Sequence, residues 1–72
     1  MKDNYENLAN AIILRAVRDY RKALKKLAKF PDDIIAMSRK QEVERFFRSR
    51  WFKVLTSLDP EMLIRKLNAE VM

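Results

Sequence analysis

The chain has 72 residues, 49% of them hydrophobic, which allows one small domain with a modest core. It contains no Cys, His or Gly, and this excludes disulfides, thiolate or imidazole chemistry and glycine-rich phosphate loops. Its 16 Lys and Arg residues outnumber its 10 Asp and Glu residues, giving a net charge of +6. We therefore expect a small basic binding module with no catalytic residue, metal site or cofactor, rather than an enzyme.

The sequence shows no targeting or membrane-spanning segment. No apolar run is longer than Ala11–Leu14, far short of the roughly 20 residues that cross a bilayer. The N-terminal stretch includes Asp3 and Glu6 and lacks the basic-then-apolar order of a secretory signal. We expect a soluble, cytoplasmic protein with a single helical domain over residues 1–72, because no repeat, linker or low-complexity tract interrupts it.

The first helix is expected to run from about Asn4 to Lys29. Asp3 or Asn4 can cap its first N–H groups, and Glu6 follows Asp3 at the spacing of a capping box. Apolar residues recur at three- and four-residue steps, which is the helical period, and form a stripe that faces a core. The stripe comprises Tyr5, Leu8, Ala9, Ile12, Ala16, Tyr20, Ala23, Leu24 and Leu27, with Ile13 at its edge.

A turn is expected at Phe30–Asp33, because Pro31 disfavours helical geometry at the residue before it. The next residues, Ile34–Met37, are interpreted as a short turn of helix that drops apolar side chains onto the core. Ser38 then offers a second helix start, with Gln41 at capping-box spacing.

From Arg39 to Ser57 the pattern is helical, but a straight helix would place Arg50 in the middle of its apolar face. Burying an unpaired guanidinium is costly. An ion pair for Arg50 or a partly exposed face would avoid that cost, but we favour a kink or break near Ser49, which is a good N-cap. A break would let the apolar side chains of the following segment turn inward, namely Trp51, Phe52 and Leu55.

The last helix has the clearest start signal, with Asp59 as N-cap, Pro60 in the first helical position and Glu61 in the first turn. Its apolar stripe consists of Leu63, Ile64, Leu67 and Val71. Together these elements predict an all-α fold, a compact three-helix bundle that becomes four helices if the middle one breaks near Ser49.

Basic residues are concentrated on the first helix. Seven cations lie between Arg15 and Phe30 against the single acid Asp19, so this segment carries +6, as much as the whole chain. A second group, from Arg39 to Lys53, has six cations and two acids. A one-sided row of Lys and Arg is typical of phosphate contacts to nucleic acid, although such a face can also serve solvation alone. The candidate contact residues are Arg15, Arg18, Arg21, Lys22, Lys25, Arg45, Arg48 and Lys53.

Leu14 lies on the basic side of the first helix rather than on its apolar stripe. A lone exposed apolar residue is ordinary, but with Val17 and a solvent-facing Phe52 it would form a patch for a partner protein or a second copy. Leu14 and Phe52 are therefore the candidate partner-binding residues. The aromatic residues of Phe46–Phe52, interleaved with cations, resemble a stacking platform for unpaired bases, although small bundles more often use such rings as core.

The segment Ala11–Phe30 also has the pattern of a cationic amphipathic helix that lies on anionic lipid. The rest of the chain, however, supplies matching apolar stripes that would bury the apolar face of this helix. Packing within the bundle is the simpler use, and we expect no membrane partner.

Two stretches, Asp3–Leu24 and Glu42–Leu67, resemble a group of small uncharacterised proteins encoded in phages and prophages of Gram-positive bacteria. The likeness is densest in FFRSRWFKVLTSLD, and such proteins often have Gly where this chain has Pro60. The resemblance implies a small accessory protein of a mobile element, acting in a bacterial host cell, and it brings no catalytic residues. Proteins of this kind commonly bind nucleic acid, or bind and block a host machine such as a defence nuclease.

Three hypotheses follow. The first is a helical module that contacts nucleic acid or a nucleoprotein through its Lys and Arg face. The second is a protein-binding adaptor or inhibitor of a host defence complex, using Leu14 and Phe52 with a rim of Arg. The third is a homodimer in which two bundles complete one core. Inhibition by an acidic surface that mimics DNA is excluded by the net charge of +6.

Overall fold

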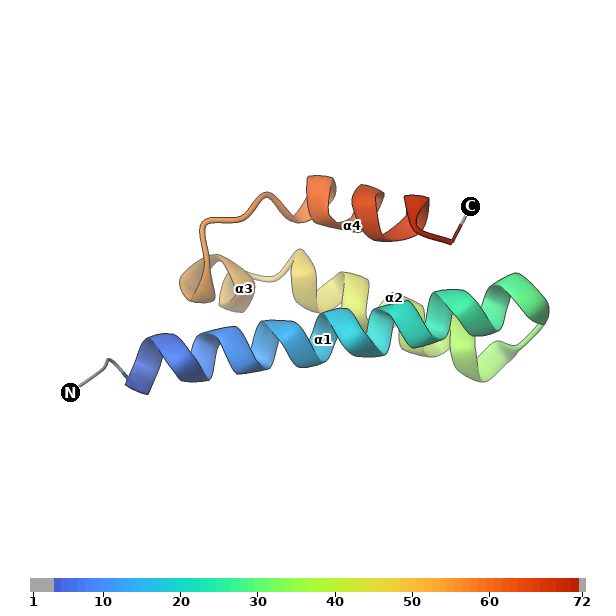
Figure 1. Ribbon diagram of the computed structural model, residues 1–72, viewed down its shortest axis with the longest axis horizontal. Coiled ribbons are helices and arrows are strands. Elements are labelled where there is room, and N and C mark those ends of the chain that lie inside the picture. The colour runs from blue at the N-terminus through green and yellow to red at the C-terminus, as the bar shows by residue number, and fades with distance from the viewer. Residues whose placement is uncertain (1–3, 72) are drawn as a thin grey trace.

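The computed structural model describes residues 4–71, with side chains from residue 7 onward, and within this range the chain forms four α-helices (Figure 1). They are α1 (Asn4–Lys29), α2 (Ile34–Phe47), α3 (Arg50–Leu55) and α4 (Pro60–Ala69). The predicted all-α bundle is confirmed, and so are the bounds of the first helix. The expected caps at Asp3 and Asn4, the carboxylate of Glu6 and the place of Tyr5 in the stripe lie outside the described side chains.

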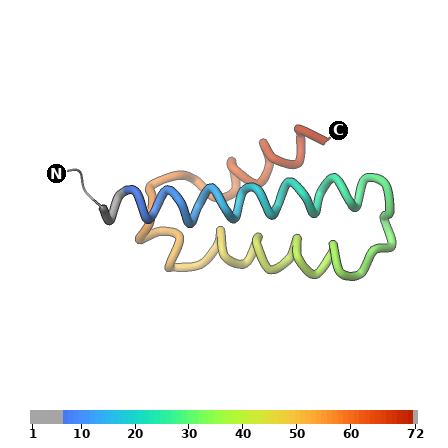
Figure 2. Tube along the Cα trace, turned by 60° about the horizontal axis from the view of Figure 1, so that its bottom comes forward, coloured from blue at the N-terminus to red at the C-terminus, as the bar shows by residue number. Residues whose placement is uncertain are grey.

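The helices pack around an antiparallel pair. α1 and α2 run side by side and are joined by the turn at Phe30–Asp33, while α3 lies beside the N-terminal half of α1 (Figures 1 and 2). α4 returns along the pair in the same direction as α1 (Figure 1). The long first helix sets the elongated shape, with extents of 46 × 20 × 19 Å.

The core lies where the four helices meet, and three aromatic rings form its centre. Tyr20, Phe47 and Phe52 are each 0% exposed. The Phe47 ring meets those of Tyr20 and Phe52 edge to face, at centroid distances of 5.8 and 5.5 Å. The buried cluster is completed by aliphatic side chains from α1, α2 and α4: Ile13, Val17, Leu24, Val43, Ile64 and Leu67.

The break predicted near Ser49 is confirmed, and Ser49 serves both helices that it separates. Its hydroxyl donates to the carbonyl of Phe46 at 2.6 Å and accepts the N–H of Phe52 at 3.3 Å. This satisfies groups at the end of α2 and at the start of α3. The break leaves Arg50 exposed and turns Phe52 into the core.

The expectation that Trp51 also turns inward is wrong, because its side chain is 55% exposed. Neighbouring residues on a helix point about 100° apart, so a helix of 6 residues that buries Phe52 cannot bury Trp51 equally. Leu55, one turn further, is half-buried against the core.

A separate helix start at Ser38 is also wrong, because α2 is continuous from Ile34. Asp33 caps it instead, accepting the N–H of Ala36 at 3.0 Å. Once a helix has begun, a Ser inside it need not end it, and no Pro or Gly interrupts this segment. Ile34 and Ile35 consequently stay exposed at 78% and 76% instead of covering the core.

The start of α4 follows its prediction. The Asp59 carboxylate accepts the N–H of Glu61 at 3.0 Å, and Pro60 stands at the first helical position.

Among the described residues, none of the helices combines the length and apolarity that a bilayer-spanning segment needs.

The double role of Ser49 can be tested against Ser38, which lies exposed within α2. We expect Ser49→Ala to lower the free energy of unfolding by about 1 kcal/mol, because two backbone groups lose their partner. Ser38→Ala should leave stability unchanged or raise it slightly, since Ala favours helix. Urea unfolding followed by circular dichroism measures both; equal losses would contradict the assignment of Ser49 as the cap.

Candidate functional site

The outward side of α1 is a row of cations. Residues three or four positions apart share one side of a helix, and five basic residues follow this spacing. All five are exposed. We call them the cationic face: Arg15, Arg18, Lys22, Lys25 and Lys29. They extend over about 21 Å along the helix, and the buried side of α1, which carries Tyr20 and Leu24, points the other way.

The cations of the face form no ion pair with a described acid, although the charge of Lys25 acts on Glu70 and helps to lower the pKa of that carboxyl. Among the described side chains, no Asp or Glu oxygen lies within 4.0 Å of a charged nitrogen of these five residues. Asp19, the one acid in this part of α1, is half-buried at the border of the face. Positive charge on this side of the molecule is therefore left for solvent or for a bound anion.

Two of the predicted contact residues, Arg21 and Arg48, are instead held in ion pairs between helices. Arg21 on α1 donates twice to Glu70, from Nε at 2.8 Å and from Nη2 at 3.0 Å. Arg48 at the end of α2 does the same to Glu61, at 2.7 and 3.0 Å. These hydrogen bonds raise the pKa of each guanidinium and lower the pKa of Glu61 and Glu70. Both arginines join α4 to the rest of the bundle.

Arg45 and Lys53 do not extend the cationic face. Arg45 is exposed on the side of α2 opposite Val43 and Phe47, which pack in the core, so it points away from α1. Lys53 is exposed on α3. The structure thus gathers four of the eight predicted contact residues on one side of α1. It adds Lys29, which sequence reasoning missed although it continues the same spacing.

Shallow hollows border the cationic face. One of about 300 Å³ lies between α1 and α2; its floor includes Ala23 and Ala36, and its rim includes Lys22, Lys26 and Arg39. Another runs beside Leu14, and Lys22 lines it too. The surface is therefore only slightly hollowed, and the cationic face is a charged helix surface rather than a binding pocket.

The candidate protein-binding patch does not exist as expected. Leu14 is 62% exposed, but Phe52 is fully buried and Val17 is 9% exposed. Phe52 cannot contribute to the patch because the break at Ser49 turns its side chain into the core. Val17 cannot contribute because it lies one turn from both Ile13 and Tyr20, on the buried side of α1. The stacking platform is likewise excluded, since Phe47 and Phe52 belong to the core.

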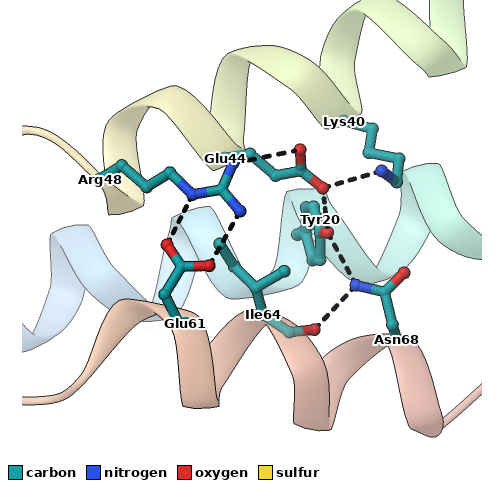
Figure 3. A network of polar contacts seen from close by, with 7 residues as sticks. All are labelled: Tyr20, Lys40, Glu44, Arg48, Glu61, Ile64 and Asn68. Atoms are coloured by element: carbon teal, nitrogen blue, oxygen red, sulfur yellow. Dashed lines mark hydrogen bonds and ion pairs between the residues drawn. The ribbon is translucent and has the colours of Figure 1, made fainter.

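A polar network behind the cationic face ties α1, α2 and α4 together (Figure 3). The Tyr20 hydroxyl donates to Glu44 at 2.5 Å and accepts from Asn68 at 2.9 Å. Lys40 donates to the same carboxylate at 2.8 Å, and an Arg48 nitrogen lies 3.8 Å from its other oxygen. Every described buried side-chain polar atom has a hydrogen-bond partner.

The network shifts the pKa values of its members in opposite directions. Burial, helped by the hydrogen bond to Glu44, raises the pKa of Tyr20 to about 12. Burial alone would raise the pKa of Glu44 as well. Hydrogen bonds from Lys40 and Tyr20, with the charges of Lys40 and Arg48, outweigh that effect and hold the pKa of Glu44 below its usual range. The network is stable as a neutral phenol and an ionised carboxylate.

Among the described residues, no group of three or more acids is arranged to hold a metal ion. Comparison with known proteins adds no relative: no family model matches the chain, and neither a curated protein nor a solved structure is similar enough to count as a match.

The phenol of Tyr20 predicts a loss of stability in alkali. The folded state holds this proton more tightly than the unfolded chain, so its stabilising effect is complete below pH 10 and is lost as the pH rises towards 12. Urea unfolding between these pH values should show a steeper decline for the native chain than for Tyr20→Phe. Parallel declines would show that the Tyr20 proton does not stabilise the fold.

Proposed function

We propose that the protein binds nucleic acid by placing the cationic face of α1 against the phosphate backbone. The observation that carries the proposal is that five exposed cations share one side of α1 and that none of them forms an ion pair with a described acid, whereas Arg21 and Arg48 are paired with acids of α4. Phosphate contacts of this kind give affinity that depends strongly on salt and little on sequence.

The shape of the face favours a duplex over a single strand. Proteins that hold single strands stack the bases on aromatic side chains. None of the five residues is aromatic. Phe30, which is 57% exposed, lines a hollow with Lys22, Lys25 and Lys29, but a single ring gives no row on which successive bases could stack, and the rings of Tyr20, Phe47 and Phe52 are buried. A straight helix with cations on one side suits the backbone of a duplex, where charges are dense and regularly spaced.

The protein-binding alternative has less support. With Phe52 and Val17 buried, Leu14 lacks the neighbours that its patch required. Action within a phage or other mobile element remains a prediction from sequence resemblance, and it is compatible with binding of either host or phage nucleic acid.

The proposal predicts that reversing charge on the face strongly weakens binding. The triple variant Arg18→Glu, Lys22→Glu, Lys25→Glu should bind labelled duplex DNA at least about tenfold more weakly in fluorescence anisotropy at low salt. The native chain should show a slope of about −4 to −5 for log affinity against log salt, as expected for five phosphate contacts. Labelled single strands, measured alongside, should bind more weakly.

A matched control carries the same change of net charge on other surfaces. The triple variant Arg45→Glu, Lys53→Glu, Lys66→Glu replaces three exposed cations outside α1. It should retain most of the affinity, and both variants should keep the helical circular dichroism of the native chain. Equal losses of affinity in the two variants would show that binding depends on net charge and not on the cationic face. No binding by the native chain at low salt would overturn the proposal.

A further inference from the structure

An exposed aromatic ring lies among lysines where α1 ends. Phe30 directly follows the last residue of α1, at the turn that leads into α2 (Figure 1). It lines a hollow of about 370 Å³, and the other lining residues are all cations: Lys22, Lys25, Lys26 and Lys29. We call this the Phe30 hollow. Three of its lysines belong to the cationic face, so the hollow forms the C-terminal end of that face.

The turn after α1 holds the backbone of Phe30 on both sides. The N–H of Phe30 donates to the carbonyl of Lys26 at 2.8 Å, and the carbonyl of Phe30 accepts the N–H of Asp33 at 3.0 Å. Pro31, the next residue, restricts this backbone further. An ordered segment therefore presents the ring, and little backbone freedom is lost when a ligand stacks on it.

The ring and the charge of the Phe30 hollow act together. The ammonium of Lys26 lies 5.7 Å from the centre of the Phe30 ring, which is a cation–π contact. No described acid lines the hollow. The nearby carboxylate of Asp33 caps α2 and lies 4.0 Å from Lys26, so the lysines of the cationic face keep their charge for a ligand.

This combination points to a flat aromatic group that carries negative charge. Cations alone are common at a helix C-terminus, because they stabilise the helix dipole. The exposed ring among them is the additional feature, and a nucleotide matches both parts. Its base has a face that stacks on an aromatic side chain, and its phosphate is attracted to lysine.

The position of Phe30 narrows the kind of nucleotide. A single ring stacks with a single base, and the bases within a continuous duplex are already stacked on each other. An unpaired nucleotide next to a duplex has a base that is free to leave the stack and meet an aromatic side chain. Phe30 lies at one end of the cationic face, where it can meet such a base while the rest of the face follows the duplex.

We propose that the protein prefers duplex nucleic acid that ends in a single-stranded overhang, with the first unpaired base stacked on Phe30. Lys22, Lys25 and Lys29 bind the phosphates beside the junction. The inference rests on the proposed function, because the cationic face must hold the duplex for Phe30 to reach the overhang.

Three forms of one labelled DNA duplex test the preference. The first has blunt ends, the second has a short overhang, and the third has the same overhang built of abasic nucleotides. The two overhangs carry the same phosphates, so a difference between them reports on the bases alone. In fluorescence anisotropy the native chain should bind the base-bearing overhang at least about fivefold more tightly than the abasic one, as expected for one base on an aromatic ring.

Substitutions of the two most exposed rings assign the preference to a residue. Phe30→Leu should bind both overhangs equally, because it keeps an apolar side chain but removes the ring, and Phe30→Tyr should restore the preference. Trp51→Leu is the matched control, since Trp51 is 55% exposed on α3 and offers a different ring to a base. It should keep the preference of the native chain, and circular dichroism checks the fold of each variant.

The outcomes separate this inference from the proposed function. Equal binding of the two overhangs by the native chain would overturn the stacking, while salt-dependent binding of the blunt duplex would still support the proposed function. A preference that persists in Phe30→Leu, or that is lost in Trp51→Leu, would overturn the role of Phe30. Deoxyadenosine monophosphate that competes as strongly as the unlabelled overhang duplex would overturn the need for a duplex. No binding of any probe would overturn the proposed function and this inference together.

Discussion

The buried hydroxyl of Tyr20 is the constraint on which the packing of three helices depends. A phenolic group taken out of water must find partners, and Tyr20 finds one on α2 and one on α4. Glu44, which accepts a hydrogen bond from this hydroxyl, is in turn held by Lys40 and approached by Arg48. Arg48 reaches on to Glu61, so a single buried group sets the register of α1, α2 and α4 through a chain of contacts.

This network also explains how the charges are distributed. Three of the acids, Glu44, Glu61 and Glu70, are engaged in contacts between or along helices. They neutralise cations at the contacts between helices, which include Arg21 and Arg48. Lys26 lies 4.0 Å from Asp33 at the border with α2, and the remaining described cations of α1 lie on the side that no helix covers. The one-sided charge of the molecule is thus a result of where its acids are needed for packing.

Local signals in the sequence predicted most of the helix ends, because caps and prolines act on their immediate neighbours. Ser49, Asp59 and Pro60 have the roles that their side chains suggest. The side chains that those helices bury were harder to predict. Whether Phe52 or Trp51 enters the core depends on how α3 docks, and the pairing of Arg21 with a residue near the other end of the chain has no local signal. Most of the cationic face could be predicted from the spacing of Lys and Arg, whereas the exposure of Trp51 could not.

The buried side and the cationic face of α1 are made of different residues. The residues that stabilise the fold are therefore separate from the residues that α1 presents to solvent. Residues such as Val17 and Tyr20 face only the core, while Arg18 and Lys22 face only water. The outward positions of α1 can therefore change their charge without removing a contact from the core, so the same bundle can carry different surfaces.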